Sequence, residues 1–306
     1  MHWARIGEGG WLWGMRAVFA LYRCCGRRPL RLLLYPVLLW FVASRPLARR
    51  ASRDYLARLY RFSGGATPAP TLANVLRHFT AFGETMLDKL RLWSGEAPDA
   101  PCHVDGAEVL LTLQQAGRGA VIATAHFGNV ELARVLAQTQ HALRLNVLVH
   151  TRHAPRFNRL LREINPQSEV DLIQVSELSA ATAILLGERV ARGEFVVIAG
   201  DRIPLSAGNR VTTQFLGAPA EFPIGPAMLA GLLRCPLLAL LTSRRSDGWH
   251  LVLRRLADEI PLPRHDRLQA VRPCVAAFAT LLEAECRAAP LQWFNFYPFW
   301  RIEHPA

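Results

Sequence analysis

The amino-acid sequence predicts an α/β fold, with a mainly parallel sheet flanked by helices and an N-terminal helical membrane anchor. Beyond residue 61, short β-like apolar runs alternate with segments of helical periodicity, which is typical of βαβ units. The 306 residues are 51% hydrophobic and 20% charged, which excludes a disordered or fibrous chain. We therefore expect a basic, apolar anchor over residues 1–60 and an α/β domain over residues 61–306.

The N-terminal segment carries most of the positive charge. Residues 1–61 contain twelve arginines against Glu8 and Asp54, a net charge of +10, whereas the whole chain has +12. The two apolar stretches, 11–22 and 30–43, are each shorter than the roughly 20 residues that a single spanning helix needs. Three arrangements fit them: one imperfect span that uses parts of both stretches, a helical pair lying in the membrane interface, or a buried helical hairpin.

Aromatic and basic side chains in this segment favour the membrane. The tryptophans and tyrosines are of the kind found at headgroup depth: Trp3, Trp11, Trp13, Tyr22, Tyr35 and Trp40. We expect eight arginines to meet anionic lipid on the cytoplasmic face: Arg23, Arg27, Arg28, Arg31, Arg45, Arg49, Arg50 and Arg53. Because the basic run is embedded in apolar residues, nucleic acid is not an expected partner.

The periodicity of the α/β domain predicts its elements in order. Strands are expected at 121–125, 145–149, 170–175, 195–199, 237–241 and 250–253, the last two paired through a turn at 244–248. Helices are expected over 70–92, 129–140, 155–164, 179–192, 223–233 and 268–287. Segment 202–222 has no clear period, and a loop of that length is typical of functional or mobile segments.

Several chemistries lack their motifs. The sequence has no GxSxG, GxxxxGK, HExxH or CxxC pattern, and its N-terminal glycines do not complete a dinucleotide fingerprint, so we expect no cofactor. The six cysteines have no regular spacing and are expected to be reduced, mostly buried thiols. No metal is expected, because these histidines share no ligand-like spacing: His103, His141, His150, His153, His250 and His265.

The candidate catalytic segment is Thr124-Ala-His-Phe-Gly-Asn-Val-Glu131, at the carboxyl end of the first strand, where open α/β sheets bind ligands. His126 and Glu131 can meet if the histidine precedes a helix whose first turn holds the glutamate. Gly128 permits the bend, and Asn129 is a good N-cap. A carboxylate on one imidazole nitrogen leaves the other to act as a general base. The alternative is a structural histidine beside an unrelated helix-start glutamate.

His126-Phe-Gly-Asn-Val-Glu131 closely resembles the HxxxxD/E core of the lysophospholipid acyltransferase superfamily. It is most similar to the bacterial lipid A late acyltransferase family of lauroyl and myristoyl transferases, whose motif usually reads His-Phe-Gly-Asn-Trp-Glu. Val130 departs from that motif at a packing position, not at the dyad. The similarity covers most of the chain and includes these blocks: 82–88, 117–121, 200–204 and 215–226. It implies a glycerol-phosphate-acyltransferase-like arrangement of the sheet and helices.

The resemblance also implies roles for further residues. It implies that Arg202, next to Asp201 at the end of a strand, helps hold an anionic substrate group or an oxyanion; the alternative is an Asp201–Arg202 pair that shapes the loop. It implies that block 222–226, with Pro223, lines an acceptor or acyl pocket, and helix initiation by proline is the alternative. The remaining substrate-binding candidates are Phe127, Gly128 and Asn129. The aromatic run 293–300 fits core packing or a membrane-facing or acyl-groove lining.

We therefore expect an O-acyltransferase on the cytoplasmic face of the bacterial inner membrane, with His126 as general base oriented by Glu131. The resemblance implies a lipid A-like or other glycolipid acceptor and an acyl thioester donor. Acylated acyl carrier protein is the expected donor, and acyl-CoA is the alternative. A polyene-lipid acyltransferase and a catalytically silent membrane-binding component of a lipid assembly are the alternatives.

Overall fold

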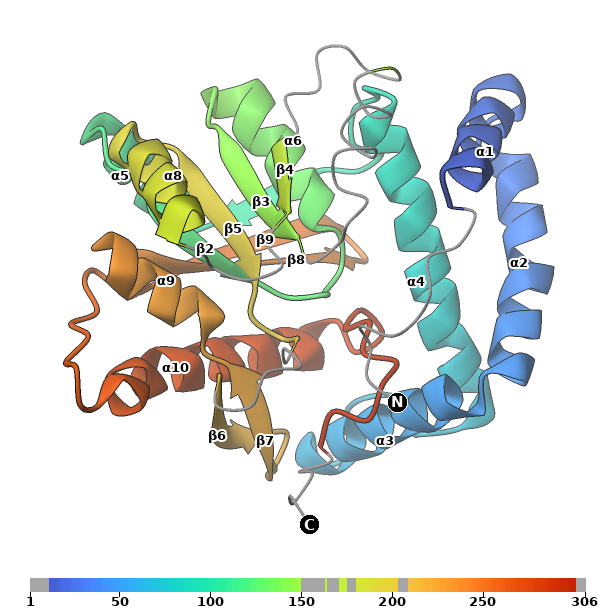
Figure 1. Ribbon diagram of the computed structural model, residues 1–306. Helices are drawn as coiled ribbons and strands as arrows, with labels where there is room; N and C mark the ends of the chain where they lie inside the picture. Colours follow the sequence, from blue (N-terminus) through green and yellow to red (C-terminus); the bar gives the residue numbers. More distant parts are fainter. Residues whose placement is uncertain (1–10, 150–162, 164–170, 175–179, 203–208, 301–306) are drawn as a thin grey trace.

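The computed structural model describes residues 11–149, 163, 171–174, 180–202 and 209–300, and a seven-stranded sheet lies at its centre (Figure 1). The strand order is β1-β9-β8-β2-β5-β3-β4, and each neighbouring pair is parallel except β8 with β9. The strands are β1 (Cys102–Asp105), β2 (Ala120–Thr124), β3 (Leu145–Val149), β4 (Asp171–Gln174), β5 (Phe195–Ala199), β8 (Leu237–Arg245) and β9 (Gly248–Ala257). The predicted mainly parallel sheet is confirmed.

Helices cover both faces of this sheet because successive strand residues point to opposite sides. In β2, Val121 and Ala123 belong to the core that contains α9 (Gly225–Leu233) and α10 (Arg267–Ala288). Ala120 and Ile122 belong to a second core, with α5 (Ala107–Gln115) and α6 (Val130–His141). A strand buried on both faces reads as a continuous apolar run, which is why the sequence predicted β2 and β5 well.

The elements of the α/β domain differ from the prediction in two places. Segment 202–222 is not without regular structure, because an antiparallel hairpin of β6 (Arg210–Phe215) and β7 (Ala218–Pro223) occupies most of it; residues 203–208 lie outside the described residues. Alternate residues of this hairpin, such as Ala220 and Phe222, are buried. The short strand β1 and helix α5 were not predicted. The expected helix over 155–164 lies almost wholly outside the described residues.

The remaining helices are α1 (Trp11–Cys25), α2 (Arg27–Ser44), α3 (Pro46–Phe62), α4 (Leu72–Trp93) and α8 (Ala180–Ala191). Helix α4, capped by the Thr71 side chain, confirms the helix predicted over 70–92. In α3, the side chains of Tyr55, Leu56 and Leu59 are fully buried in the same core as β2 and α10. Residues on the two sides of the expected boundary at residue 60 therefore share one core.

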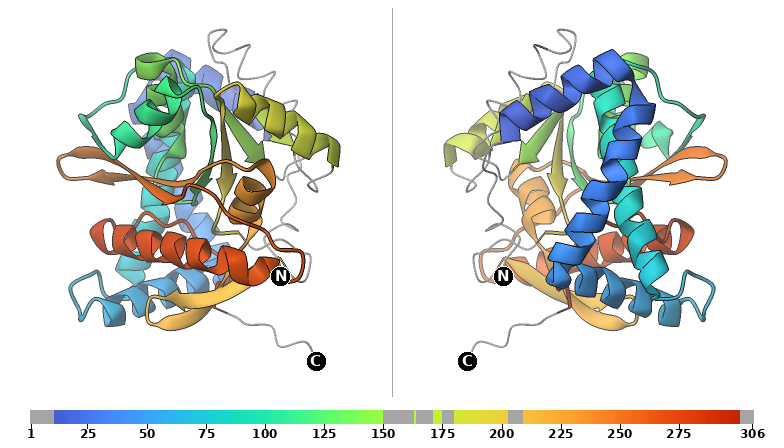
Figure 2. Two further views of the ribbon diagram at one scale, coloured as in Figure 1. Left: turned by 90° about the vertical axis from the view of Figure 1, so that its left-hand side faces the viewer. Right: turned by 90° about the vertical axis from the view of Figure 1, so that its right-hand side faces the viewer.

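Helix α2 lies at the periphery of the molecule, against α4 (Figure 2). It buries Leu30, Leu38 and Val42 and turns a series of large apolar side chains outward: Leu32, Leu33, Tyr35, Val37, Leu39, Trp40 and Phe41. Among the described residues no single helix is long and apolar enough to span a membrane. Helices α2 and α3 meet that requirement only together, and they bend by 93° at the break between them.

Not every N-terminal polar group faces outward as expected. Arg27 forms ion pairs with Glu84 and Asp88 of α4 and with Asp99, at N–O distances of 3.1, 2.7 and 3.0 Å. Arg31 pairs with Glu84. Tyr22 is buried and donates a hydrogen bond to Glu96. The expectation that Tyr22 and Arg27 face lipid is therefore wrong, because carboxylates on and after α4, distant in sequence, bind them. The Arg31 side chain is 54% exposed, so its contact with lipid stays a prediction. Cys24 and Cys25 are exposed, whereas Cys235, Cys274 and Cys286 are buried.

Candidate active site

The register of β2 and β5 brings His126 and Asp201 together. The two strands are parallel neighbours in which Thr124 lies opposite Ala199. The backbone N–H of Gly200 donates to the carbonyl oxygen of Thr124 at 2.7 Å, which continues the pairing past the ends of the strands. The next residues on both chains therefore meet at the carboxyl edge of the sheet, the usual location of ligand sites in open α/β sheets.

The Asp201 carboxylate accepts three N–H groups. Its Oδ1 atom lies 2.9 Å from the ring Nδ1 of His126, and its Oδ2 atom accepts from the His126 backbone N–H at 2.9 Å and from the Trp293 indole at 3.1 Å. The aspartate side chain is fully buried, whereas 47% of the His126 side chain is exposed. No hydrogen bond to His126 Nε2 occurs within the described residues. The imidazole is held at one nitrogen and open at the other.

Electrostatics keep this pair in the state that a base requires. Burial alone would raise the pKa of Asp201, but the His126 ring and Arg202 hold that pKa well below its usual range. Partial desolvation of the ring within the site and the positive charge of Arg202 lower the pKa of His126, and Asp201 offsets part of this. A lowered pKa favours the neutral imidazole, and a neutral ring whose Nδ1 proton points to the carboxylate leaves Nε2 able to accept a proton.

Glu131 lies in the first turn of α6, as expected, but its partner is Arg134. The guanidinium donates to the Glu131 carboxylate three residues earlier on the same helix, and 5% of the arginine side chain is exposed. Among the described residues no bond joins Glu131 to His126. In this structure the carboxylate that binds the His126 ring is that of Asp201, because the strand register directs the ring toward β5. The Glu131 carboxylate forms its ion pair with Arg134 instead.

Lys89 is a further charged residue beside this site that the sequence did not single out. It is the single lysine of the chain and lies on α4. Burial lowers the pKa of Lys89, and Glu131 offsets part of this. The lysine charge in turn helps to lower the pKa of His126. These interactions place Lys89 near both residues of the expected dyad. Only the packing of α4 on α6 could have revealed it.

The residues between the histidine and the helix have distinct local roles. Gly128 has φ +53°, and an added Cβ would lie 1.7 Å from the carbonyl oxygen of Thr242, so only glycine fits. Phe127, a substrate-binding candidate, is fully buried and forms an isolated bridge with Trp293, so its side chain packs in the core. Asn129 is the N-cap residue of α6, as expected, but its side chain makes no capping hydrogen bond. Both polar atoms of its amide are buried without a partner in the described residues.

Arg202 is held by the C-terminal aromatic segment. Its guanidinium donates to Asn295 Oδ1 at 3.1 Å and to the carbonyl oxygen of Phe294 at 2.9 Å, and it stacks on the Tyr297 ring at 4.8 Å. Among the described residues no ion pair joins Asp201 to Arg202, so the loop-shaping pair is not formed. Burial raises the pKa of Tyr297 to about 12, and its hydroxyl donates to the Asp201 carbonyl.

The same C-terminal segment also contacts the backbone around His126. Trp293, Phe294 and Phe299 are buried, as the core-packing interpretation of the aromatic run predicted. In addition, the Phe294 N–H donates to the His126 carbonyl, and the Gly128 N–H donates to that of Gln292. Residues 292–297 thus pack beside the end of β2, in addition to β5 and α6.

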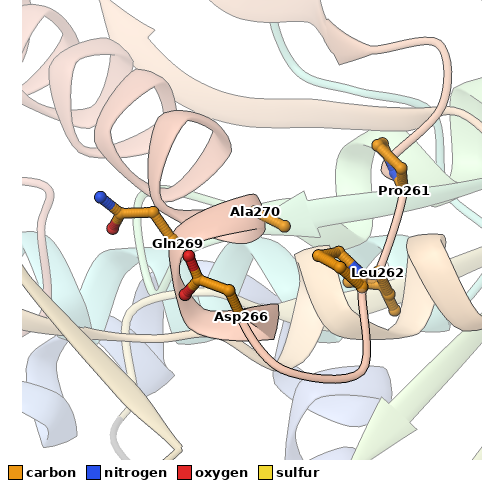
Figure 3. Close-up of a pocket in the computed structure, with 6 residues that line it drawn as sticks. Pro261, Leu262, Asp266, Gln269 and Ala270 are labelled. Atoms are coloured by element: carbon orange, nitrogen blue, oxygen red, sulfur yellow. The ribbon is translucent and has the colours of Figure 1, made fainter.

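Pro223 is the last residue of β7, and the proline in the first turn of α9 is Pro226. Both prolines line a small, mainly apolar cavity together with Gly200, Ala123 and Phe278 of α10. A larger hollow lies between loop residues 261–263 and Gln269 and Ala270 of α10 (Figure 3). That hollow is open and sits at the beginning of α10, whereas Trp293 follows the other end of this 22-residue helix, so it is separate from the histidine.

The structure thus places a half-exposed histidine, held by a buried carboxylate, at the carboxyl edge of the mainly parallel sheet of an α/β fold. Residues 74–302 match the family model described as bacterial lipid A biosynthesis acyltransferase, and the chain belongs to that family. The predicted family is thereby confirmed. A comparison with curated proteins found no match. Family membership supports transferase activity, with an acyl donor and a lipid acceptor.

Proposed function

We propose that this protein transfers a fatty acyl chain from an acyl thioester to a hydroxyl group of a lipid A-like or other glycolipid acceptor. The observation that carries this proposal is the contact between His126 Nδ1 and buried Asp201, which leaves Nε2 exposed at the sheet edge. A base of this kind activates a hydroxyl without a protein nucleophile.

The chemistry begins when Nε2 of His126 takes the proton of the acceptor hydroxyl. The alkoxide oxygen attacks the thioester carbonyl carbon, the C–S bond of the tetrahedral intermediate breaks, and the leaving thiolate takes the proton back from the imidazolium. Asp201 stabilises the transient imidazolium through Nδ1. Arg202 and Lys89 add positive charge near the ring, and such charge stabilises an oxyanion.

Asn129 and Glu131 stay within the proposed site in supporting roles. The Asn129 amide carries a buried donor and a buried acceptor without partners. An unmet amide of this kind costs about 1–3 kcal/mol, which a substrate contact would offset. Glu131 compensates the charges of Arg134 and Lys89. A direct role for Glu131 as the partner of His126 is the rival assignment.

The donor that we propose is an acylated acyl carrier protein, with acyl-CoA as the alternative. Acyl carrier protein is acidic, and this chain has a formal net charge of +12, so electrostatic attraction speeds their encounter. The described residues contain no feature that selects one thiol carrier, so a competition between the two donors is the direct measurement.

We further propose that the protein binds the cytoplasmic face of the inner membrane through α2. The outward-facing side chains of this helix, with Leu32 at 72% and Trp40 at 65% exposure, form an apolar surface suited to a membrane interface. Several arginines near it are exposed and suited to anionic lipid: Arg23, Arg28, Arg45, Arg50 and Arg53.

The test is to incubate the purified full-length protein with membranes and a radiolabelled acyl carrier protein thioester, then to identify the labelled lipid by mass spectrometry. The expected product is an ester-linked acyl glycolipid that forms with wild type and not with His126→Ala. Equal labelling by both proteins would refute the proposed base. If neither an acyl carrier protein thioester nor acyl-CoA gives any labelled lipid, the result would favour a catalytically silent membrane component.

A further inference from the structure

A cluster of three side chains with metal-binding chemistry lies on strands other than β2 and β5, which lead to His126 and Asp201. It consists of His103 of β1, His250 of β9 and Asp247 in the turn between β8 and β9. We propose that this cluster is a binding site for a divalent first-row transition metal of the Zn²⁺ type. The sequence did not suggest it, because 144 residues separate His103 from Asp247.

The sheet brings the two histidines to the same face. His103 and His250 are direct partners in the parallel pairing of β1 with β9, so their side chains point the same way. Their ring centroids are 4.8 Å apart. The Asp247 Oδ1 atom lies 2.9 Å from His250 Nε2, and one ligand atom from each of the three residues lies within 4.8 Å of the other two.

The backbone beneath these side chains is fixed. Gly248 has φ +140°, and an added Cβ would lie 2.4 Å from the carbonyl oxygen of Pro101. The N–H of Trp249 donates to that same oxygen at 2.8 Å. The turn that carries Asp247 is therefore tied to the residue just before β1. A site whose ligands lie on fixed elements loses little conformational entropy when it binds an ion.

The charge and chemistry of the cluster suit a borderline-soft cation. Two imidazoles and one carboxylate form a typical donor set for Zn²⁺, Ni²⁺ or Cu²⁺. The two arginines before the turn have their own partners, since Arg244 pairs with Asp99 and Arg245 with Glu285, both at 2.9 Å. Zinc ligand bonds of about 2.0–2.2 Å require the three ligand atoms to shift from these positions, and the His103 side chain is exposed.

Two consequences follow for binding. Three protein ligands leave at least one coordination position for water. The ion must also replace the proton between His250 and Asp247, so its affinity should fall as the pH falls. An ion at this place would cross-link the four-residue edge strand β1 to the β8–β9 hairpin, and binding to the folded state alone raises the melting temperature.

The experiment uses the full-length protein without a polyhistidine tag and titrates Zn²⁺ by calorimetry, with Co²⁺ absorption as a second reading of ligand geometry. The variants are His103→Gln and His250→Gln, and the matched control is His265→Gln, an exposed histidine outside the cluster. Wild type and the control should bind Zn²⁺ and melt at a higher temperature with it. Each cluster variant should lose at least about tenfold in affinity, because even indirect supports of a metal ligand contribute that much.

Three results would overturn the proposal: no Zn²⁺ binding by wild type, equal affinity in all four proteins, or the same loss in His265→Gln as in the cluster variants. Thiol binding does not confuse the comparison, because the exposed Cys24 and Cys25 are present in every protein tested. Melting curves recorded with a chelator show whether the variants are folded before Zn²⁺ is added.

Discussion

The sheet edge around His126 and the outer face of α2 differ in which kind of side chain they bury. At the sheet edge, polar groups are buried and almost all are paired: Asp201 accepts three N–H groups and Arg202 donates to two oxygens. On α2, apolar groups such as Leu32, Leu33 and Trp40 are exposed. Hydrogen bonding at the sheet edge fixes the orientation of the His126 ring. The exposed apolar face of α2 suits contact with a fluid apolar phase such as lipid, which requires no fixed side-chain geometry. The two regions should therefore fail independently when they are altered.

The largest effect is expected at the histidine. His126→Ala should lower turnover by about 10²–10⁴, because general-base assistance contributes that much to rate. Binding to anionic vesicles should not change, since His126 is not among the side chains that α2 exposes. Acyl transfer is measured with a labelled thioester and vesicle binding by sedimentation, with His265→Ala as the control. Turnover near that of wild type would show that another group is the base.

The next effect separates the two carboxylates. Asp201→Asn removes the charge that stabilises the imidazolium, and it should lose more activity than Glu131→Gln, which keeps an acceptor oxygen for Arg134. Turnover is measured for both variants after circular dichroism has shown that each is folded. The opposite order would make Glu131 the orienting partner and Asp201 a structural residue.

A third, smaller effect concerns the face of α2. Replacing Leu32, Leu33 and Trp40 together with serine should reduce partition onto anionic vesicles by at least about tenfold, because burial of each such side chain is worth about 1.5–3 kcal/mol. Activity on a soluble, short-chain acceptor should be kept. The matched control replaces three exposed apolar residues elsewhere, Ile184, Leu232 and Leu268. If the control weakens vesicle binding equally, α2 is not the membrane surface.

The smallest effect is a shift in pH dependence. Only neutral His126 can take a proton, so kcat/KM should fall as the pH falls through the histidine pKa, which lies below its ordinary 6.5. Arg202→Gln removes a positive charge that lowers this pKa, so the acid limb should move to higher pH. Arg202→Lys keeps the charge, so its limb should move less, although it loses the fork that binds Asn295 and Phe294. An unchanged limb in Arg202→Gln would remove Arg202 from the electrostatics of the base.

Local patterns in the sequence were sufficient for most of the sheet and its helices. The apolar runs 121–125, 145–149 and 195–199 correspond closely to β2, β3 and β5, and the three- and four-residue spacing over 70–92 corresponds to α4. These features depend on neighbours in the chain, because side-chain direction repeats every two residues in a strand and every 3.6 in a helix. The β6–β7 hairpin was missed because burial of its alternate residues depends on α10 and the C-terminal segment.

The sequence by itself determined that a histidine would stand just past a buried strand, with a glycine that permits the bend and a glutamate at the start of the next helix. Only the tertiary structure decided which carboxylate holds that histidine. The strand order places β5 beside β2, so the carboxylate of Asp201, 75 residues after His126, contacts His126 Nδ1. Glu131 instead accepts a hydrogen bond from Arg134. The N-terminal arginines follow the same rule: the sequence set their number, but the packing of α2 on α4 turned Arg27 and Arg31 toward carboxylates. Ion pairs and proton-transfer partners form between side chains that are close in space, and the order of strands and helices sets that closeness.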